Sequence, residues 1–386
     1  DDVATDGSNN IYITGTFYGM LDFDPGLGTD NHTSDSPEMD IFLIKLDSSG
    51  NFLWANTWGG SGGDAGRGVA TDELENVYVT GNFWLDTVDF DPGPDVDNHT
   101  SNGYVDAFLS KFDASGNFLW AKTFGGDYGD FSTGIIIDGS DNVCITGYFD
   151  STTVDFDTGL GEDWHNLSSY PSPSGGSDVF LIKLGPSGNF LWAKTWGGSY
   201  QDYGDDITTD GSDNIYVTGC FLLGTVDFDP GPGVDNHTSN GNYDVFLSKI
   251  DSSGNFIWAQ TWGGINNDFG YGITADELDN IYVTGMFDDT VDFDPGSGVD
   301  WHTSNGDYDA FLSKFDASNN LLWAKTWGGS GGSPSNDVVT DELENVYVTG
   351  FFQGTVDFAP GPSVDNRASN GSSDVFLHKF LPDGSW

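Results

Sequence analysis

Basic residues are scarce in this sequence, and their scarcity excludes two classes of partner. The 386 residues include 11 Lys and Arg against 61 Asp and Glu, which gives a formal net charge of −50. Nucleic acids and anionic membrane surfaces are both bound through clustered Lys and Arg. Long apolar runs are missing too, and none approaches the ~20 residues that a helix needs to cross a bilayer. We therefore expect no nucleic-acid partner and no membrane insertion.

Cysteines and catalytic motifs are equally sparse. Cys144 and Cys220 fall in neighbouring repeats at positions that do not correspond, which predicts two buried thiols rather than a disulfide framework. The sequence holds no phosphate-binding loop, no dinucleotide loop and no zinc-type Cys/His cluster. Residues 59–63 and 328–332 read GGSGG and match G-x-S-x-G, but that nucleophile motif requires a following helix. A strand is expected there instead, so we predict that the protein is not an enzyme.

Repetition is what the sequence has in abundance. Six glycines follow a Val-Thr or Ile-Thr pair at intervals of 65 to 72 residues: Gly15, Gly81, Gly147, Gly219, Gly285 and Gly350. They define six repeats at about 1–66, 67–132, 133–204, 205–270, 271–336 and 337–386, which we interpret as one domain spanning 1–386. The longest interval contains an insertion at Asn166–Ser177, whose Pro, Ser and Gly content indicates a surface loop.

Each repeat contains four segments rich in β-branched and aromatic residues, and no segment shows a helical period. In the second repeat we place these strands at Gly68–Asp72, Asn76–Phe83, Asp106–Asp113 and Asn117–Gly126. Four antiparallel strands repeated six times around an axis predict an all-β fold, a six-bladed β-propeller. The first strand of each blade should lie nearest the axis and the fourth outermost.

The last blade is expected to lack its outer strand. Asp1 aligns with Arg67 at a first strand, and Trp386 aligns with Phe52 at the start of a fourth strand. The third strand of the last blade, Asp374–Phe380, should therefore expose unpaired backbone groups. Such an edge recruits other strands, supplied here by further residues of the chain or by a neighbouring subunit.

The repeated phrases resemble a known family. They read GNFLWAKTWGG, GVATDELENVYVTGNF, TVDFDPGPG and DAFLSKFDASG. Together they resemble the SBBP-type bacterial β-propeller repeat and are similar in outline to NHL-type repeats, over essentially the whole chain. The resemblance implies a secreted or surface-associated bacterial propeller. It implies no activity, because propellers host enzymes and inert scaffolds alike.

Most of the lysines also follow the repeat. One repeat position holds Lys45, Lys111, Lys183, Lys249, Lys314 and Lys379. We expect each to be a structural residue that pairs with an aspartate of its own blade. Tryptophans of the fourth strand, such as Trp192 and Trp196, should pack between adjacent sheets.

Pairs of aspartates separated by one Phe are the most regular polar motif. The pairs are Asp22 and Asp24, Asp89 and Asp91, Asp155 and Asp157, Asp227 and Asp229, and Asp292 and Asp294. In an extended strand both carboxylates of a pair share one face, and a cation between them would relieve their repulsion, which makes calcium a candidate cofactor. Asp-Pro-Gly is equally a turn sequence, and Ala359 replaces the second acid of the last copy. We favour the turn and keep calcium as the alternative.

Five histidines recur in the loop after these aspartates. They are His32, His99, His165, His237 and His302, and Arg367 takes their place in the sixth repeat. Because each lies in a different blade, we expect surface-loop positions rather than a shared metal site.

Two functions fit this sequence. An acidic, Asp-rich, lysine-poor β-protein suits an extracellular or cell-surface location, and near-identical blades favour a structural or adhesive propeller. Such a protein would be a subunit of a fibre or surface layer, through self-association or through a surface or glycan partner. The alternative is a carbohydrate-binding or hydrolytic propeller with a site at the axial mouth. That function requires distinctive acids or aromatics, and the candidates are Tyr170 in the insertion and Trp164 and Trp301 in a repeated loop.

Overall fold

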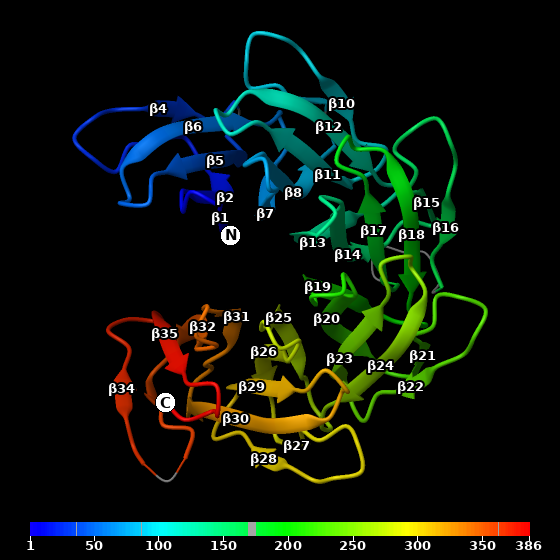
Figure 1. The fold of residues 1–386 in the computed structure, drawn as a ribbon, viewed down its shortest axis with the longest axis vertical. Coiled ribbons are helices and arrows are strands. Elements are labelled where there is room, and N and C mark those ends of the chain that lie inside the picture. Colours follow the sequence, from blue (N-terminus) through cyan, green and yellow to red (C-terminus); the bar gives the residue numbers. More distant parts are fainter. Residues whose placement is uncertain (36, 86, 169–174, 362) are drawn as a thin grey trace. The chain divides into compact units, whose positions relative to one another are not determined.

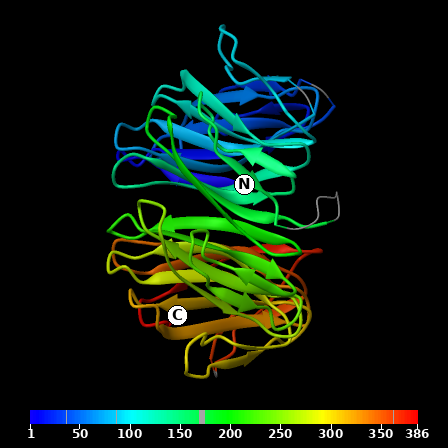
Figure 2. The same ribbon diagram turned by 90° about the vertical axis from the view of Figure 1, so that its right-hand side faces the viewer.

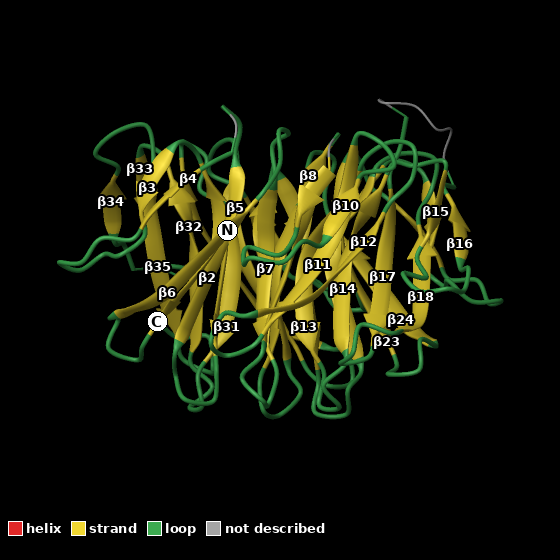
Figure 3. Cartoon of the chain, turned by 90° about the horizontal axis from the view of Figure 1, so that it is seen from above, coloured by secondary structure: helices red, strands yellow, loops and turns green. Residues whose placement is uncertain are grey.

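Every regular element of the protein is a β-strand. The computed structural model describes residues 1–35, 37–85, 87–168, 175–361 and 363–386, and Tyr170 lies outside them. Among the described residues there is no helix (Figure 3), and hence no helical segment that could span a bilayer. The chain divides into two compact units, Asp1–Thr195 and Trp196–Trp386. Within each unit, three sheets lie side by side (Figures 1 and 2).

Three blades follow one another in the first unit, each with its strands hydrogen-bonded in chain order. Blade 1 contains β1 (Asp2–Thr5), β2 (Ile11–Phe17), β5 (Asp40–Leu46) and β6 (Phe52–Trp58). Blade 2 contains β7 (Ala65–Thr71), β8 (Val77–Trp84), β11 (Val105–Phe112) and β12 (Phe118–Phe124). Blade 3 contains β13 (Asp130–Ile137), β14 (Val143–Phe149), β17 (Asp178–Leu184) and β18 (Phe190–Trp196).

The second unit repeats the arrangement, except that its last blade has three strands. Blade 4 contains β19 (Asp202–Thr209), β20 (Ile215–Leu222), β23 (Tyr243–Ile250) and β24 (Phe256–Trp262). Blade 5 contains β25 (Phe269–Ala275), β26 (Ile281–Phe287), β29 (Asp309–Phe315) and β30 (Leu321–Gly329). Blade 6 contains β31 (Ser335–Thr340), β32 (Val346–Phe352) and β35 (Asp374–Phe380). The prediction of an all-β, six-bladed propeller with an incomplete last blade is confirmed.

A short two-stranded ribbon connects the second and third strands of every blade, and the sequence analysis missed it because its strands have only three residues each. The ribbons are β3 (Met20–Asp22) with β4 (Asn31–Thr33), β9 (Thr87–Asp89) with β10 (Asn98–Thr100), β15 (Thr153–Asp155) with β16 (Trp164–Asn166), β21 (Thr225–Asp227) with β22 (Asn236–Thr238), β27 (Thr290–Asp292) with β28 (Trp301–Thr303), and β33 (Thr355–Asp357) with β34 (Asn366–Ala368).

One glycine per blade is required by close approach rather than by a turn. A Cβ on Gly81 of β8 would collide with the carbonyl oxygen of Ala65 and with the ring of Phe108. The neighbouring first and third strands therefore press against this backbone from both sides. The repeated glycine that reveals the repeat in the sequence is thus fixed by packing.

The turn between the first and second strands is organised by one aspartate. In blade 2, Asp72 Oδ1 accepts the backbone N–H groups of Leu74 (3.0 Å) and Asn76 (2.8 Å), and Glu75 has φ 62°. Side-chain oxygens that bond the backbone a few residues ahead stabilise such turns. The same carboxylate, through Oδ2, accepts the hydroxyl of Tyr78 at 3.1 Å.

A buried lysine completes this arrangement. Lys111 Nζ lies 3.2 Å from Asp72 Oδ2 and 2.5 Å from the Tyr78 hydroxyl, and it donates to the carbonyl of Pro186 in blade 3 at 3.1 Å. The predicted pairing with a local aspartate is confirmed in four more blades: Lys45–Asp6 (3.4 Å), Lys183–Asp138 (2.7 Å), Lys249–Asp210 (3.0 Å) and Lys314–Asp276 (3.5 Å).

Both tryptophans of the fourth strand pack between blades. The second Trp packs on the next blade, as Trp58 does against Phe108 and Phe112 with ring centroids 6.5 and 5.1 Å away. The first Trp packs against its own blade and the next one, as Trp54 does against Tyr12 at 6.1 Å and against Gly116 of blade 2. Packing between adjacent sheets is therefore confirmed for both tryptophans. The two cysteines are buried and free, as predicted.

Candidate binding site at the variable end of the blades

The predicted calcium residues form five separate turns. In blade 2, Asp89 Oδ1 accepts the N–H groups of Asp91 (3.2 Å) and Asp97 (2.8 Å), and Asp91 Oδ1 accepts that of Gly93 (2.7 Å). The first acid keeps this role in the last copy, where Asp357 Oδ1 accepts the N–H of Ala359 at 3.1 Å. Across the described residues, no three His, Cys, Asp or Glu side chains gather as a metal site would require.

The repeated histidines lie on the ribbons, and each contacts the fourth strand of its own blade. His99 packs edge-on against the buried Phe90 with centroids 5.4 Å apart, and its Nδ1 lies 3.0 Å from the Thr123 hydroxyl of β12. His99 is half-buried rather than fully exposed. Its role within one blade agrees with the expectation that these histidines do not share a metal.

Sequence differences between the blades gather at one end, which we call the variable end. It is the end at which the first strand begins and the second strand finishes. The register of the first strand breaks there at a β-bulge, for example between Gly66 and Gly68 of β7. A bulge leaves one residue out of the ladder and re-aims its side chain. In the five blades that have this bulge the residue is Arg67, Thr133, Asp205, Tyr271 or Asn336, and Asp1 occupies the corresponding position in blade 1.

Two positions of the second strand vary in the same way. The residue after the repeated glycine is Thr16, Asn82, Tyr148, Cys220, Met286 or Phe351. The next residue is Phe in all six blades, and the one after it is Tyr18, Trp84, Asp150, Leu222, Asp288 or Gln353. Alternation along a strand places the constant Phe on one face and the two variable residues on the other. The face that carries the Phe is therefore constant in all six blades, while the opposite face diverges.

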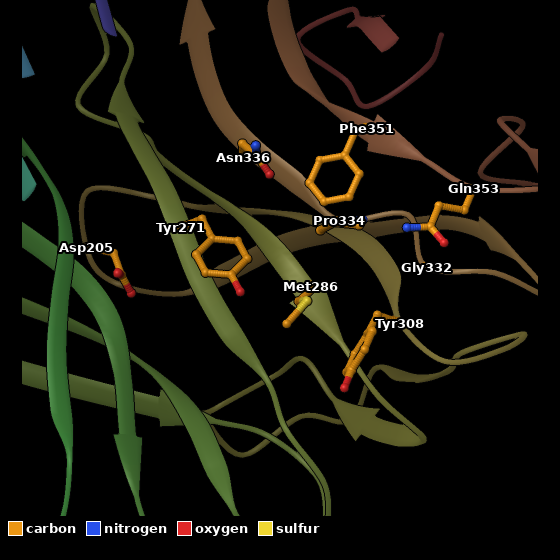
Figure 4. A pocket seen from close by; sticks show the side chains of 9 residues that line it. All are labelled: Asp205, Tyr271, Met286, Tyr308, Gly332, Pro334, Asn336, Phe351 and Gln353. Atoms are coloured by element: carbon orange, nitrogen blue, oxygen red, sulfur yellow. The ribbon is translucent and has the colours of Figure 1, made fainter. Parts of the chain in front are cut away.

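In the second unit these variable residues line a cavity of ≈ 600 Å³. Figure 4 shows side chains of the first strands, second strands and connecting loops facing the same space. Aromatic and apolar surface comes from Tyr271, Tyr308, Phe351, Met286 and Pro334, and hydrogen-bonding groups come from Asp205, Asn336 and Gln353. Cavities of this size with a few convergent polar groups are typical of small-molecule sites.

Asp205 is the charged residue of this cavity. Its neighbour Asp206 is fully engaged, because Oδ1 accepts the N–H of Ile207 (2.8 Å) and Oδ2 accepts that of Ile273 in blade 5 (2.9 Å). Asp205 Oδ2 is buried and has no hydrogen-bond partner among the described residues. Burial raises the pKa of Asp205 to about 8, so this carboxyl is largely protonated at neutral pH.

Other buried aspartates near this end belong to the repeat and brace the loops. In blade 3, Asp130 Oδ2 accepts the N–H of Gly126 and the hydroxyl of Ser151, both at 2.7 Å. Burial raises the pKa of Asp130 to about 7, opposed by these hydrogen bonds. Asp130 Oδ1 is likewise buried without a hydrogen-bond partner among the described residues. Asp205 differs from Asp130 because it is the bulge residue of its strand and lines the cavity.

The first unit has a second cavity of ≈ 570 Å³ at its own variable end. It is lined by Arg67 from the bulge of β7, by Thr16 and Trp84 from second strands, and by Glu38 and Met39 from a loop. Arg67 Nη1 lies 3.7 Å from Asp1 Oδ1, and both side chains are partly exposed. The two cavities occupy corresponding places but present different chemistry.

The sequence analysis missed these residues, although a signal was present. It searched for one divergent blade or one divergent loop, whereas the divergence is spread over all blades at fixed positions. Aligning the repeats column by column would have revealed that Asp205, Tyr271 and Asn336 share one column.

Comparison with known proteins agrees with this architecture. Residues 257–286, which include most of the first two strands of blade 5, match the family model of the SBBP β-propeller repeat. The chain is a β-propeller repeat protein.

Relatives of this β-propeller repeat protein are distant. An uncharacterized WD repeat-containing protein of Acanthamoeba polyphaga mimivirus is 26% identical over 415 residues, which cover 90% of this chain and 30% of that protein. The regulatory protein FlaEY of Caulobacter vibrioides is 26% identical over 218 residues, 55% of this chain and 22% of that protein. The chain thus spans less than a third of these curated relatives. A solved protein of unknown function from Bacteroides caccae has 6% identity and a TM-score of 0.41, covering 96% of this chain and 91% of that one.

Calcium at the aspartate pairs stays a prediction with a direct test. If the pairs bind calcium in this propeller, excess chelator should lower the melting temperature and added calcium should restore it. The gain per independent site follows RT ln(1 + [L]/Kd). Asp89→Asn combined with Asp91→Asn should then reduce the chelator effect, and Asp127→Asn serves as a control outside the motif. An unchanged melting curve in chelator would leave these residues with their turn role alone.

Proposed function

We propose that this β-propeller repeat protein is an extracellular or cell-surface adhesive protein that binds a ligand at the variable end of its blades, without catalysis. One observation carries the proposal. Side chains diverge at the bulge and on the face of the second strand opposite the constant Phe, while the packing positions beside them stay the same. Packing between blades explains the constant positions and gives no reason for this localised divergence. Selection for binding a ligand would explain this divergence.

The chemistry of the second unit's cavity supports binding rather than turnover. Its lining combines tyrosines, Phe351, a carboxyl and two amides, and none of its described lining residues is His, Cys, Lys or Arg. The described lining residues therefore include no Ser, Cys or Lys nucleophile beside a His base, an arrangement common in hydrolytic sites. The acidic, lysine-poor composition supports the external location.

Paired tyrosine substitutions test the site. A panel of monosaccharides, amines and amino acids is screened against the whole chain by ligand-observed NMR. Hits should lose at least about tenfold in affinity on Tyr271→Ala combined with Tyr308→Ala, because aromatic surface supplies much of the binding energy in such cavities. Leu278→Ala combined with Leu343→Ala, two exposed residues in turns between first and second strands, should leave the hits unchanged. A panel without hits, or hits indifferent to the tyrosines, would contradict the proposal.

A second candidate function, assembly, is favoured by the edge of blade 6. Among the described residues, β35 pairs with β32 and has no strand on its other side. A groove of ≈ 360 Å³ runs beside it, lined by Phe352, Phe358, Phe376 and Trp386. In the other five blades a strand of the Phe-Leu-Trp-Ala-Lys-Thr-Trp type covers this edge. We propose that a strand of this type from a neighbouring subunit docks there.

Competition by a synthetic peptide tests the assembly. Light scattering on size-exclusion chromatography should show oligomers that grow with protein concentration. The peptide GNFLWAKTWGG should dissolve them, because it satisfies the open edge. A variant peptide with Pro in place of Ala removes a backbone donor and should have no effect. A chain that stays monomeric at every concentration, or oligomers that ignore the peptide, would rule assembly out.

A further inference from the structure

The unmet hydrogen bond of Asp205 indicates what the cavity of the second unit binds. A buried polar atom without a partner is costly and is rarely retained without a function. Asp205 Oδ2 is such an atom, and so are single oxygens of several aspartates that the repeat places in most blades. Asp205 is distinguished from those aspartates because it lines the cavity and is a bulge residue that the repeat does not dictate. A ligand that reaches this oxygen must therefore donate a hydrogen bond to it.

The residues around Asp205 restrict the chemical class of the ligand further. Tyr271 and Tyr308 offer aromatic faces within the same cavity, and Met286 and Phe351 offer apolar surface (Figure 4). None of the lining residues that the structure describes is basic, so a carboxylate or phosphate ligand would meet Asp205 with no cation to compensate its charge. The net charge of −50 raises the local concentration of cations and lowers that of anions.

We propose that this cavity binds a primary alkylammonium group, such as the end of a lysine side chain, with its N–H groups on Asp205 and its alkyl chain on the apolar surface. The proposal rests on the proposed function of the variable end and names the chemistry of its ligand. An ammonium group supplies both the missing donor and an opposite charge, and charge-assisted hydrogen bonds are the stronger kind. The tyrosine rings add cation–π attraction.

Other classes of ligand supply either the hydrogen-bond donor or the positive charge, but not both. A quaternary ammonium ion has the charge but no N–H to donate. An alcohol or a sugar has a donor but no charge. These differences separate the candidates in a single series of probes.

The pH dependence has a definite sign. Asp205 must be ionised to attract a cation, and its pKa is raised by burial to about 8, so affinity should rise as pH rises through that value. The titratable groups that face Asp205 are Asp202 and Asp206 on its own strand, Cys220 on β20 and Tyr271 on β25. Burial raises the pKa of both Cys220 and Tyr271, so these two stay neutral.

Titration calorimetry on the whole chain, at fixed ionic strength, tests the inference with four probes: butylammonium, tetramethylammonium, 1-butanol and methyl β-glucoside. Butylammonium should bind roughly 100-fold more tightly at about pH 9 than at about pH 6, as the ionised fraction of a group titrating near pH 8 dictates. Asp205→Asn should flatten this profile and weaken binding at pH 9 by at least about tenfold. Glu277→Gln removes the same charge at an exposed turn and should change neither.

Thermal melting checks separately that the Asp205→Asn variant is folded. The pKa of Asp205 is higher in the folded than in the unfolded chain, so its contribution to the free energy of unfolding falls as pH rises from about 4 to about 8. Asp205→Asn should therefore melt no lower than the parent at pH 9. Equal binding of butylammonium to parent and Asp205→Asn, or of tetramethylammonium and butylammonium, would overturn the ammonium proposal. Glucoside binding that depends on Tyr271 and Tyr308 would also overturn it while sustaining a binding site at the variable end. If none of the four probes binds and the wider panel also gives no hit, both the ammonium proposal and the proposed binding site at the variable end are wrong.

Discussion

The structure depends on an ion pair between a lysine removed from solvent and an aspartate, which holds together each of the first five blades. In blade 2, Lys111 contacts Asp72, which shapes the first turn, and Tyr78, which belongs to the second strand, and it reaches Pro186 in the next blade. A charge removed from water is tolerated only when every partner is in place. Burial opposes ionisation of Asp72, yet hydrogen bonds from Asn76 and Lys111 leave its pKa below the usual value. The group therefore fixes the turn, three strands and the contact with the neighbouring blade together.

This constraint separates the blade into a fixed part and a free part. The lysine, its aspartate and the constant Phe of the second strand leave little room for change, because each contacts several others. At the opposite end, the bulge residue lies outside the strand ladder, and its side-chain contacts differ between blades, as for Arg67 with Asp1 and Thr133 with the carbonyl of Thr146. The chain can place Asp205 in one blade and Tyr271 in the next without disturbing the packing. Divergent chemistry on an unchanging scaffold is how propellers acquire ligands.

The fold could be predicted from the sequence because residues with the same packing role recur in six repeats. The glycines, the lysines and the strand order could all be read from it. The ribbons could not, because three-residue strands carry too short a pattern and Asp-Pro-Gly between them reads only as a turn. Asp205 escaped notice because its character comes from burial and a missing partner, which sequence does not reveal.

A double-mutant cycle on Lys111 and Asp72 tests the account most directly. Lys111→Met should lower the free energy of unfolding by about 3–5 kcal/mol, because it leaves a buried carboxylate unpaired. The loss on combining it with Asp72→Asn should fall well short of the sum of the single losses. Lys122→Met, the same change on β12 at a half-buried position, should cost about 1 kcal/mol or less. Losses for Lys111→Met no greater than for Lys122→Met, or simple additivity with Asp72→Asn, would contradict the claim that this ion pair holds the blade together.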